Sequence, residues 1–165
     1  MNKRGIMQIP FGMIFSIIII IAILGVAIFA IVKFVGVYKC VNTGMFKENL
    51  QSSVNNAWSG TGEYSDEFPR QGGFPSGIDY VCFIDTSSEE RGAYEDFYME
   101  FERFWNEDAN IFFYPLTKAC EGQASYYIEH LNITKITEKQ NPYCVSATEK
   151  IKIKKGFYDI LVEIE

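Results

Sequence analysis

Residues 9–32 read IPFGMIFSIIIIIAILGVAIFAIV, and this uncharged run decides how the rest of the chain is placed. Gln8 and Lys33 bracket it, so the run holds 24 residues without a charged side chain. As an α-helix it is roughly 36 Å long, and the hydrocarbon core of a bilayer, about 30 Å thick, needs about 20 apolar residues. The sequence therefore predicts a transmembrane helix over residues 9–35 that contacts the lipid bilayer, with residues 1–8 as a short basic leader or cytoplasmic tail.

A cleaved secretory signal is the main alternative for this segment. Such a signal has an apolar core of about 7–15 residues, followed by a small-x-small cleavage site. Gly25-Val26-Ala27 has that spacing, but the apolar run continues to Val32, five residues past Ala27. The length of the run favours a helix that stays in the membrane.

The helical pattern continues beyond the membrane segment, over residues 36–58. Apolar and polar residues alternate there with helical spacing, which predicts an amphipathic helix whose apolar face lies against the following domain. The apolar positions are Val41, Met45, Phe46, Leu50, Val54, Ala57 and Trp58. Ser59 to Gly62 then ends the helix, and residues 59–77, rich in Gly, Ser and Pro, are interpreted as a loop or linker.

Residues 78–165 have the patterning of one small α+β domain. Buried strands are predicted at residues 78–85 and 109–114, and the intervening helix, residues 94–105, has an aromatic face suited to packing on a sheet. This order indicates a βαβ-like unit. Later strands are predicted at residues 126–133, 143–146, 149–154 and 157–165, the last three as a closing β-meander. The expected fold class is α+β: a long N-terminal helix, first transmembrane and then amphipathic, followed by a small α/β head with a mostly antiparallel sheet.

The distribution of charge limits the partners that the head can bind. Residues 1–39 carry four basic and no acidic residues, and the formal net charge of the chain is −6, so residues 40–165 carry −10. An acidic domain repels phosphate backbones and anionic lipid headgroups, so nucleic acid is not an expected partner. The only histidine is His130 and no two cysteines have CxxC spacing, so neither a metal site nor a cofactor is expected.

The cysteines bear on the compartment of the head, and they are Cys40, Cys82, Cys120 and Cys144. In an oxidising compartment one disulfide is expected among the last three. Cys120–Cys144 is the favoured pair, because the two flank one segment, and Cys82 is the alternative partner; buried free thiols are the remaining interpretation. Together with the acidic head and an N-glycosylation sequon at Asn132, the cysteines favour an extracytoplasmic domain. Lysines on both flanks of the membrane segment leave the positive-inside rule ambiguous.

No stretch of the chain matches a catalytic motif. Asp85-Thr86-Ser87-Ser88-Glu89 follows a predicted strand and is interpreted as the cap and first turn of the next helix, not as a divalent-ion site. We therefore expect a single-pass membrane-anchored surface protein with a binding or scaffolding role and no enzymatic activity. The alternative is a membrane-tethered enzyme or sensor accessory domain whose site the sequence does not reveal.

The layout of the chain resembles that of type IV pilin-like proteins. Lys3-Arg4-Gly5-Ile6-Met7 is similar to an archaeal class III leader, and the resemblance implies cleavage by a prepilin peptidase between Gly5 and Ile6. It also implies a long helix, a small head with a late β-sheet, and assembly with other membrane or filament subunits. Pilins typically carry a glutamate five residues after the cut, where this chain has Pro10. The chain is also similar to small archaeal single-pass membrane proteins, which implies localisation at the cell membrane.

Overall fold

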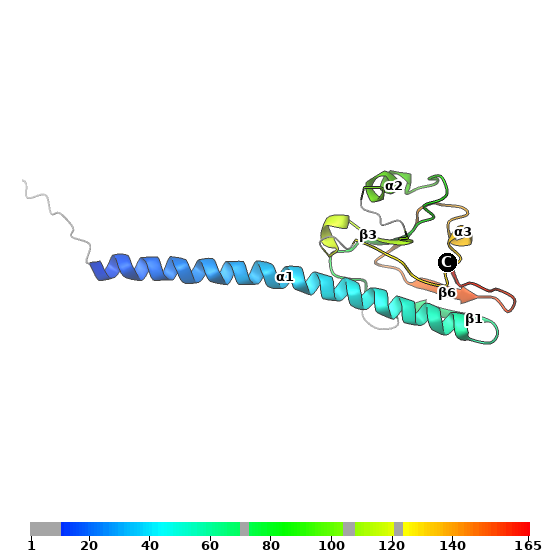
Figure 1. The fold of residues 1–165 in the computed structure, drawn as a ribbon, viewed down its shortest axis with the longest axis horizontal. Helices are drawn as coiled ribbons and strands as arrows, with labels where there is room; N and C mark the ends of the chain where they lie inside the picture. Colours follow the sequence, from blue (N-terminus) through cyan, green and yellow to red (C-terminus); the bar gives the residue numbers. More distant parts are fainter. Residues whose placement is uncertain (1–10, 70–72, 104–107, 121–123) are drawn as a thin grey trace, which may run out of the picture. The chain divides into compact units, whose positions relative to one another are not determined.

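The computed structural model describes residues 11–69, 73–103, 108–120 and 124–165 (Figure 1). The chain divides into two compact units, residues 1–36 and 37–165. A long helix, α1 (Phe11–Ser59), contributes to both units, and the second unit, here called the head, adds two antiparallel sheets and short helices. The α+β class expected from the sequence is confirmed.

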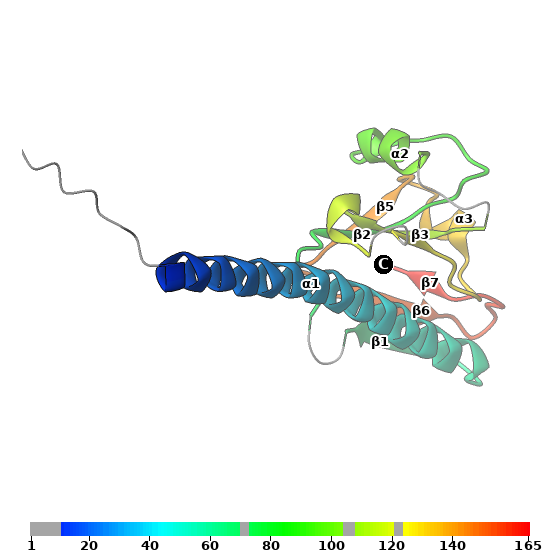
Figure 2. The same cartoon turned by 60° about the vertical axis from the view of Figure 1, so that its left-hand side comes forward.

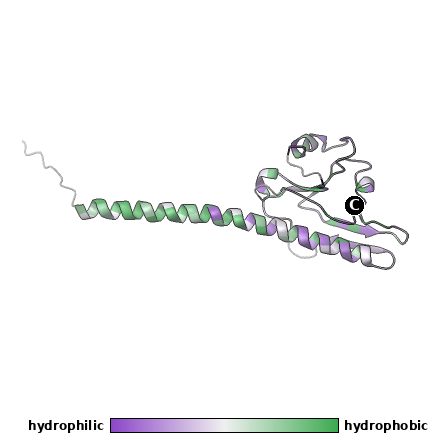
Figure 3. Ribbon diagram, in the orientation of Figure 1, coloured by the Kyte–Doolittle hydropathy of each residue, from purple (hydrophilic) through white to green (hydrophobic). Residues whose placement is uncertain are grey.

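Residues 11–36 of the first unit form an α-helix whose side chains are all exposed. Figure 3 shows the apolar character of this stretch, which holds one hydroxyl, Ser16, and one charge, Lys33. The Ser16 Oγ donates a hydrogen bond to the Gly12 carbonyl 2.8 Å away, so its polar group is satisfied within the helix. Within the described residues, α1 is the one helix long and apolar enough to cross a membrane.

From residue 37 onward α1 belongs to the head and buries one face. The buried side chains recur every three or four residues and are Thr43, Phe46, Leu50, Val54 and Ala57. The apolar face predicted for residues 36–58 also included Val41, Met45 and Trp58, but these three side chains are exposed. The face of the helix that is buried therefore contains fewer of the apolar residues than the sequence pattern predicted.

In the described part of the head, seven strands form two antiparallel sheets (Figures 1 and 2). The three-stranded sheet has the order β1-β6-β7, with β1 at Tyr64–Phe68, β6 at Ile151–Lys155 and β7 at Glu163–Ile164. The four-stranded sheet has the order β4-β3-β2-β5, with β4 at Ser125–Tyr126, β3 at Ile111–Tyr114, β2 at Tyr80–Phe83 and β5 at Tyr143–Ser146. Between the strands lie α2 (Glu95–Phe101), the 3₁₀-helix η1 (Leu116–Lys118) and α3 (Ile133–Ile136).

Three predictions about the strands of the head fail wholly or in part, two of them because strand pairing joins residues far apart in the sequence. β2 and β3 are antiparallel neighbours, so the strand–helix–strand order does not form a βαβ unit. The closing β-meander forms only in part. β6 pairs with β7 as expected, but β5 pairs with β2, and the other neighbour of β6 is β1, which lies inside the stretch interpreted as a linker, residues 59–77. The strand predicted at residues 126–133 ends at Tyr126, and α3 begins at Ile133.

The four-stranded sheet is buried on both faces, because alternate side chains of a strand point to opposite faces. Side chains of one face, such as Val81 and Phe113, join the buried face of α1 in the main core. Side chains of the other face, such as Cys82 and Phe112, lie under α2, where the Phe101 ring centroid is 4.8 Å from that of Phe112. Figure 2 shows α2 on one side of this sheet. The aromatic face of α2 therefore serves the core.

A buried polar cluster holds the loop that follows β2. The Asp85 carboxylate accepts hydrogen bonds from the Ser87 backbone N–H at 3.0 Å, the Ser87 hydroxyl at 2.6 Å and the Ser88 hydroxyl at 3.0 Å. The fully buried Asn141 side chain donates to the Asp85 and Ser88 carbonyls and accepts from the Asp85 backbone N–H. Because α2 begins only at Glu95, these groups fix a loop, and the helix-capping role predicted for them is wrong.

The Asp85 carboxylate makes the free energy of unfolding of the head depend on pH in the acidic range. Burial alone would raise the pKa of Asp85, but hydrogen bonds from Ser87 and Ser88 lower it below the ordinary value of 3.8. A carboxyl group whose pKa falls on folding stabilises the fold at pH values above its unfolded pKa, and this stabilisation is lost as the pH falls through the folded-state pKa.

We predict that the free energy of unfolding falls more steeply in the wild type than in Asp85→Asn as the pH drops from about 5 to about 3. At about pH 7, Asp85→Asn should lower this free energy by about 1–3 kcal/mol, because the amide nitrogen cannot accept the hydroxyl hydrogen bond that a carboxylate oxygen accepts. Denaturant unfolding of the full chain in detergent, followed by near-UV circular dichroism, measures both. The exposed Asp79→Asn is the matched control, and equal pH slopes in wild type and Asp85→Asn would contradict the assignment.

Candidate functional site

All four cysteines are paired, in two disulfides. Cys40 on α1 pairs with Cys120, which follows η1, and the two Cα atoms are 4.4 Å apart. Cys82 on β2 pairs with Cys144 on β5, at opposed positions of neighbouring strands with Cα atoms 4.0 Å apart. The favoured prediction, Cys120–Cys144, is therefore wrong, and its alternative partner Cys82 is the residue bonded to Cys144. The free-thiol interpretation fails as well, since no cysteine is free.

Both disulfides follow from the fold. The register of β2 and β5 places Cys82 directly opposite Cys144, which the sequence could not show without the strand pairing. Cys40 lies three residues before Thr43, the first buried side chain of α1, so it belongs to the head and not to a separate membrane segment. A native disulfide in a small domain typically contributes about 2–5 kcal/mol of stability.

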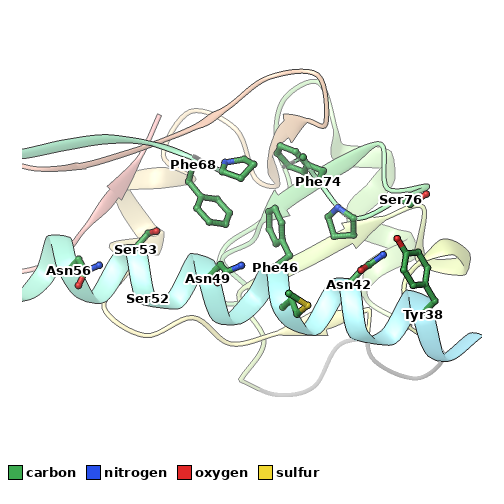
Figure 4. A pocket seen from close by; sticks show the side chains of 14 residues that line it. Tyr38, Asn42, Phe46, Asn49, Ser52, Ser53, Asn56, Phe68, Phe74 and Ser76 are labelled. Carbon is green, nitrogen blue, oxygen red and sulfur yellow. The ribbon is translucent and has the colours of Figure 1, made fainter. Parts of the chain in front are cut away.

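A groove runs beside the second half of α1 (Figure 4). Its volume is about 830 Å³, and its floor is aromatic: the ring centroid of Phe46 lies 5.0 Å from that of Phe68 and 5.2 Å from that of Phe74. The helix forms one wall, and Phe68 at the end of β1, Pro69 and residues 73–76 form the other. Along the helix the groove extends from Tyr38 to Asn56, which is about 27 Å at 1.5 Å per residue. It is therefore elongated along α1.

The described side chains that line this groove are all uncharged. On α1 they are Tyr38, Asn42, Met45, Phe46, Asn49, Ser52, Ser53 and Asn56, and on the opposite wall they are Phe68, Pro69, Gly73, Phe74, Pro75 and Ser76. The amides and hydroxyls among them donate and accept hydrogen bonds, and none is a group that titrates near neutral pH. A head with a net charge of −9 over residues 37–165 thus carries a long strip of described residues without charge, whose groups suit contact with a partly apolar, hydrogen-bonding surface.

Sequence reasoning missed this groove, because one of its walls lies in the stretch interpreted as a linker. The signal that could have found it is the spacing of Asn42, Asn49 and Asn56, which are seven residues apart. Asn49 and Asn56 are exposed, so they lie outside the core-forming face of α1. Polar residues that repeat with the period of a helix mark a second organised face.

The histidine lies in an aromatic stack at the end of α1. The His130 and Trp58 rings have centroids 3.8 Å apart and planes 3° from parallel. The His130 Nε2 is 3.7 Å from the Glu129 carboxylate. A Cys–His nucleophile pair needs a free thiolate, and every cysteine is in a disulfide. The position of His130 therefore indicates a structural stack.

Several charged groups of the head engage neighbouring residues at the surface. Lys150 Nζ lies 3.0 Å from the Glu67 carboxylate, and Lys155 Nζ donates at 2.7 Å to the Trp58 carbonyl at the end of α1. These two lysines of the β6 region are therefore engaged by other residues. Within the described residues, no group of three or more His, Cys, Asp or Glu is placed to hold a metal ion.

Two predicted sites stay predictions. The leader cleavage site, Gly5–Ile6, and Pro10 lie outside the described residues. Asn132 is the N-cap of α3, where its side-chain oxygen accepts from the Lys135 backbone N–H at 3.3 Å, and its glycosylation is not tested by this geometry. Among known proteins, no family model, curated protein or solved structure matches the chain.

The disulfide pairing predicts a specific pattern of thiol labelling. Membrane-extracted protein that is unfolded in iodoacetamide without reductant should take up no label, whereas prior reduction should give four labels. Replacing Cys40 by serine should release one thiol, and peptide mapping should place it at Cys120. Label at Cys82 or Cys144 in the Cys40→Ser variant would contradict the pairing.

Proposed function

We propose that this chain is a single-pass, membrane-anchored extracytoplasmic protein that acts as a scaffolding or assembly subunit with a pilin-like layout. The observation that carries the proposal is the Cys40–Cys120 disulfide, which bonds the head part of α1 to the residue that follows η1, eight residues after the apolar run ends at Val32. This covalent bond fixes the second half of α1 to the rest of the head. Fixed attachment suits a protein that holds partners in position, whereas a tethered enzyme needs only a flexible linker.

The exposed apolar side chains of α1 support the membrane anchor. From Phe11 to Val37 every large apolar side chain is exposed. Apolar surface of this extent is unfavourable in water, so the segment needs either lipid or other apolar helices around it. A spanning helix satisfies its own backbone hydrogen bonds, so a bilayer accepts it without further contacts.

Two features support the extracytoplasmic side. Disulfides persist in oxidising compartments and are rare in the cytosol, and this head uses all of its cysteines in disulfides. The net charge of −10 over residues 40–165 also differs from that of domains held against the anionic cytoplasmic leaflet, which use polybasic patches.

The pilin-like part of the proposal is supported by the division of α1. Its side chains are apolar and exposed as far as Val37, and from Thr43 onward one face forms the core of the head. In an assembly of such subunits, the apolar stretches can bundle with one another, and before assembly they lie in lipid. The groove beside α1 fits binding, since its groups are amides, hydroxyls and aromatic rings.

Cells that express the full chain with a C-terminal tag test the anchor and its sidedness together. Carbonate-washed membranes should retain the protein, and protease added to intact spheroplasts should remove the tag. An Ile20→Asp, Leu24→Asp double variant should leave the membrane, because each charge at the centre of a spanning helix costs about 2.5–3.5 kcal/mol. The control is a Met99→Asp, Lys139→Asp double variant in the head, where both residues are exposed.

Soluble wild-type protein would contradict the anchor, and a protected tag would contradict the extracytoplasmic side. The same preparation from a host with an archaeal prepilin peptidase tests the pilin-like part by N-terminal sequencing. A start at Ile6 supports leader processing, and Gly5→Val should abolish it. A start at Met1 in the wild type contradicts the pilin-like part and leaves the anchor in place.

A further inference from the structure

We propose that the groove beside α1 is the seat of a second copy of this chain, with the two α1 helices paired in parallel over residues 38–56. This inference rests on the proposed function, because anchoring in one membrane is what gives both helices the same direction. It adds the partner, the contact surface and the register of the contact.

The spacing of the groove residues on α1 is that of a coiled-coil seam. Six of them follow one another at alternating steps of four and three residues: Tyr38, Asn42, Met45, Asn49, Ser52 and Asn56. In heptad terms the asparagines take position a, and the other three take position d. All six are exposed except the half-buried Asn42, so the seam is open in one copy of the chain.

The asparagines specify the kind of pairing. In a parallel pair, equivalent a residues face each other, and a buried asparagine at a fixes register and favours two strands at a cost in stability. Each side-chain amide both donates and accepts hydrogen bonds, so Asn49 of one copy can bond to its equivalent in the other. There are three such asparagines on each helix. Only in a parallel pair that is in register does each of them face its equivalent in the other copy.

The shape of the groove also favours a helix as its occupant. Contacts from Tyr38 to Asn56 extend over about 27 Å of α1, which is the length of a helical segment and longer than a compact small molecule. The opposite wall, with Phe68 and Phe74, offers apolar surface to the side chains of the second helix. The knobs of that helix would fill the groove while its backbone lies along α1.

Charge gives an independent reason for a second copy. Two heads that each carry −9 repel one another, and like charges in contact cost several kcal/mol. The fourteen described residues that line the groove carry no charge, so these residues form a face on which two acidic heads can meet. The chemistry of the face is also self-complementary, since amides, hydroxyls and aromatic rings can each contact their own kind.

The same heptad positions continue into the membrane segment of the sequence without a charge. They are Ile14, Ile17, Ile21, Leu24, Ile28, Ile31 and Val35. Lys33 and Ser16 fall at positions f and c, which face away from the partner in such a pair. Pairing in the bilayer would therefore bury neither of them between the helices.

Cysteine crosslinking of the full chain in membranes tests this pairing. Because the native cysteines are all in disulfides, an introduced cysteine is the only free thiol. Mild oxidation should crosslink Asn49→Cys and Ser52→Cys into dimers at least about tenfold more than Lys47→Cys, which lies two residues from Asn49 and on the far side of the helix. Mass spectrometry of the product should show two copies of this chain.

A charge variant separates a specific seam from chance collision. Asn49→Lys should reduce crosslinking through Ser52→Cys by about tenfold or more, because it places two ammonium groups face to face. Asn49→Leu, at the same exposed position, should retain it. Near-UV circular dichroism and the absence of thiol labelling at the native cysteines show that each head is folded.

The outcomes distinguish this inference from the proposed function. Equal crosslinking of Lys47→Cys and Asn49→Cys overturns the seam, and so does a product that joins Asn49→Cys to a different protein. Protein that is anchored, outside and disulfide-bonded, yet not crosslinked through Asn49→Cys, overturns the pairing and leaves the proposed function standing. Protein that is not retained in the membrane overturns both.

Discussion

Burial of one face of α1, from Thr43 to Ala57, is the interaction on which the head depends. Leu50, Val54 and Ala57 have no exposed surface, and they share one core with side chains from both sheets, such as Val81 of β2 and Ile153 of β6. The two sheets have no hydrogen-bonded strand pair in common in the described residues. Each fully buried large apolar side chain contributes about 1.5–3 kcal/mol, so the helix supplies contacts that hold two separate sheets in one domain.

The features that follow from local periodicity could be predicted from the sequence. The 3–4 spacing of Phe46, Leu50 and Val54 indicates a helix with one buried face, and the apolar run before it indicates a membrane-length segment. The strand at Tyr143–Ser146 was also predicted from the local sequence pattern, and the structure confirms it. These signals depend on neighbours along the chain, so a single sequence contains them.

Features that depend on distant pairing could not be predicted in the same way. β1 has the sequence YSDEF, and its polar residues suggested a linker. Only the pairing with β6 shows that this segment is a strand. Ile160 continues the alternation of Val162 and Ile164, yet its side chain is 82% exposed, because only the later two residues reach the core. The disulfide partners of Cys40 and Cys144 likewise depend on tertiary contacts.

The candidate site falls between these two cases. One wall of the groove belongs to α1, and the seven-residue spacing of its asparagines is visible in the sequence. The other wall needs the segment after β1 to come back beside the helix. One helix thus presents an apolar segment long enough to cross a membrane, a core-forming face and an uncharged face that lines the groove, and each uses its own main set of residues.

Hydrogen exchange of the full chain in detergent tests most directly whether α1 is a structural part of the head. We predict that backbone amides at residues 46–57 exchange as slowly as those of β2 and β3, because all of them open only when the head unfolds as a unit. Rapid exchange at residues 46–57, at the rate of a solvent-exposed helix, while β2 and β3 stay protected, would contradict the role of α1 as the core of the head.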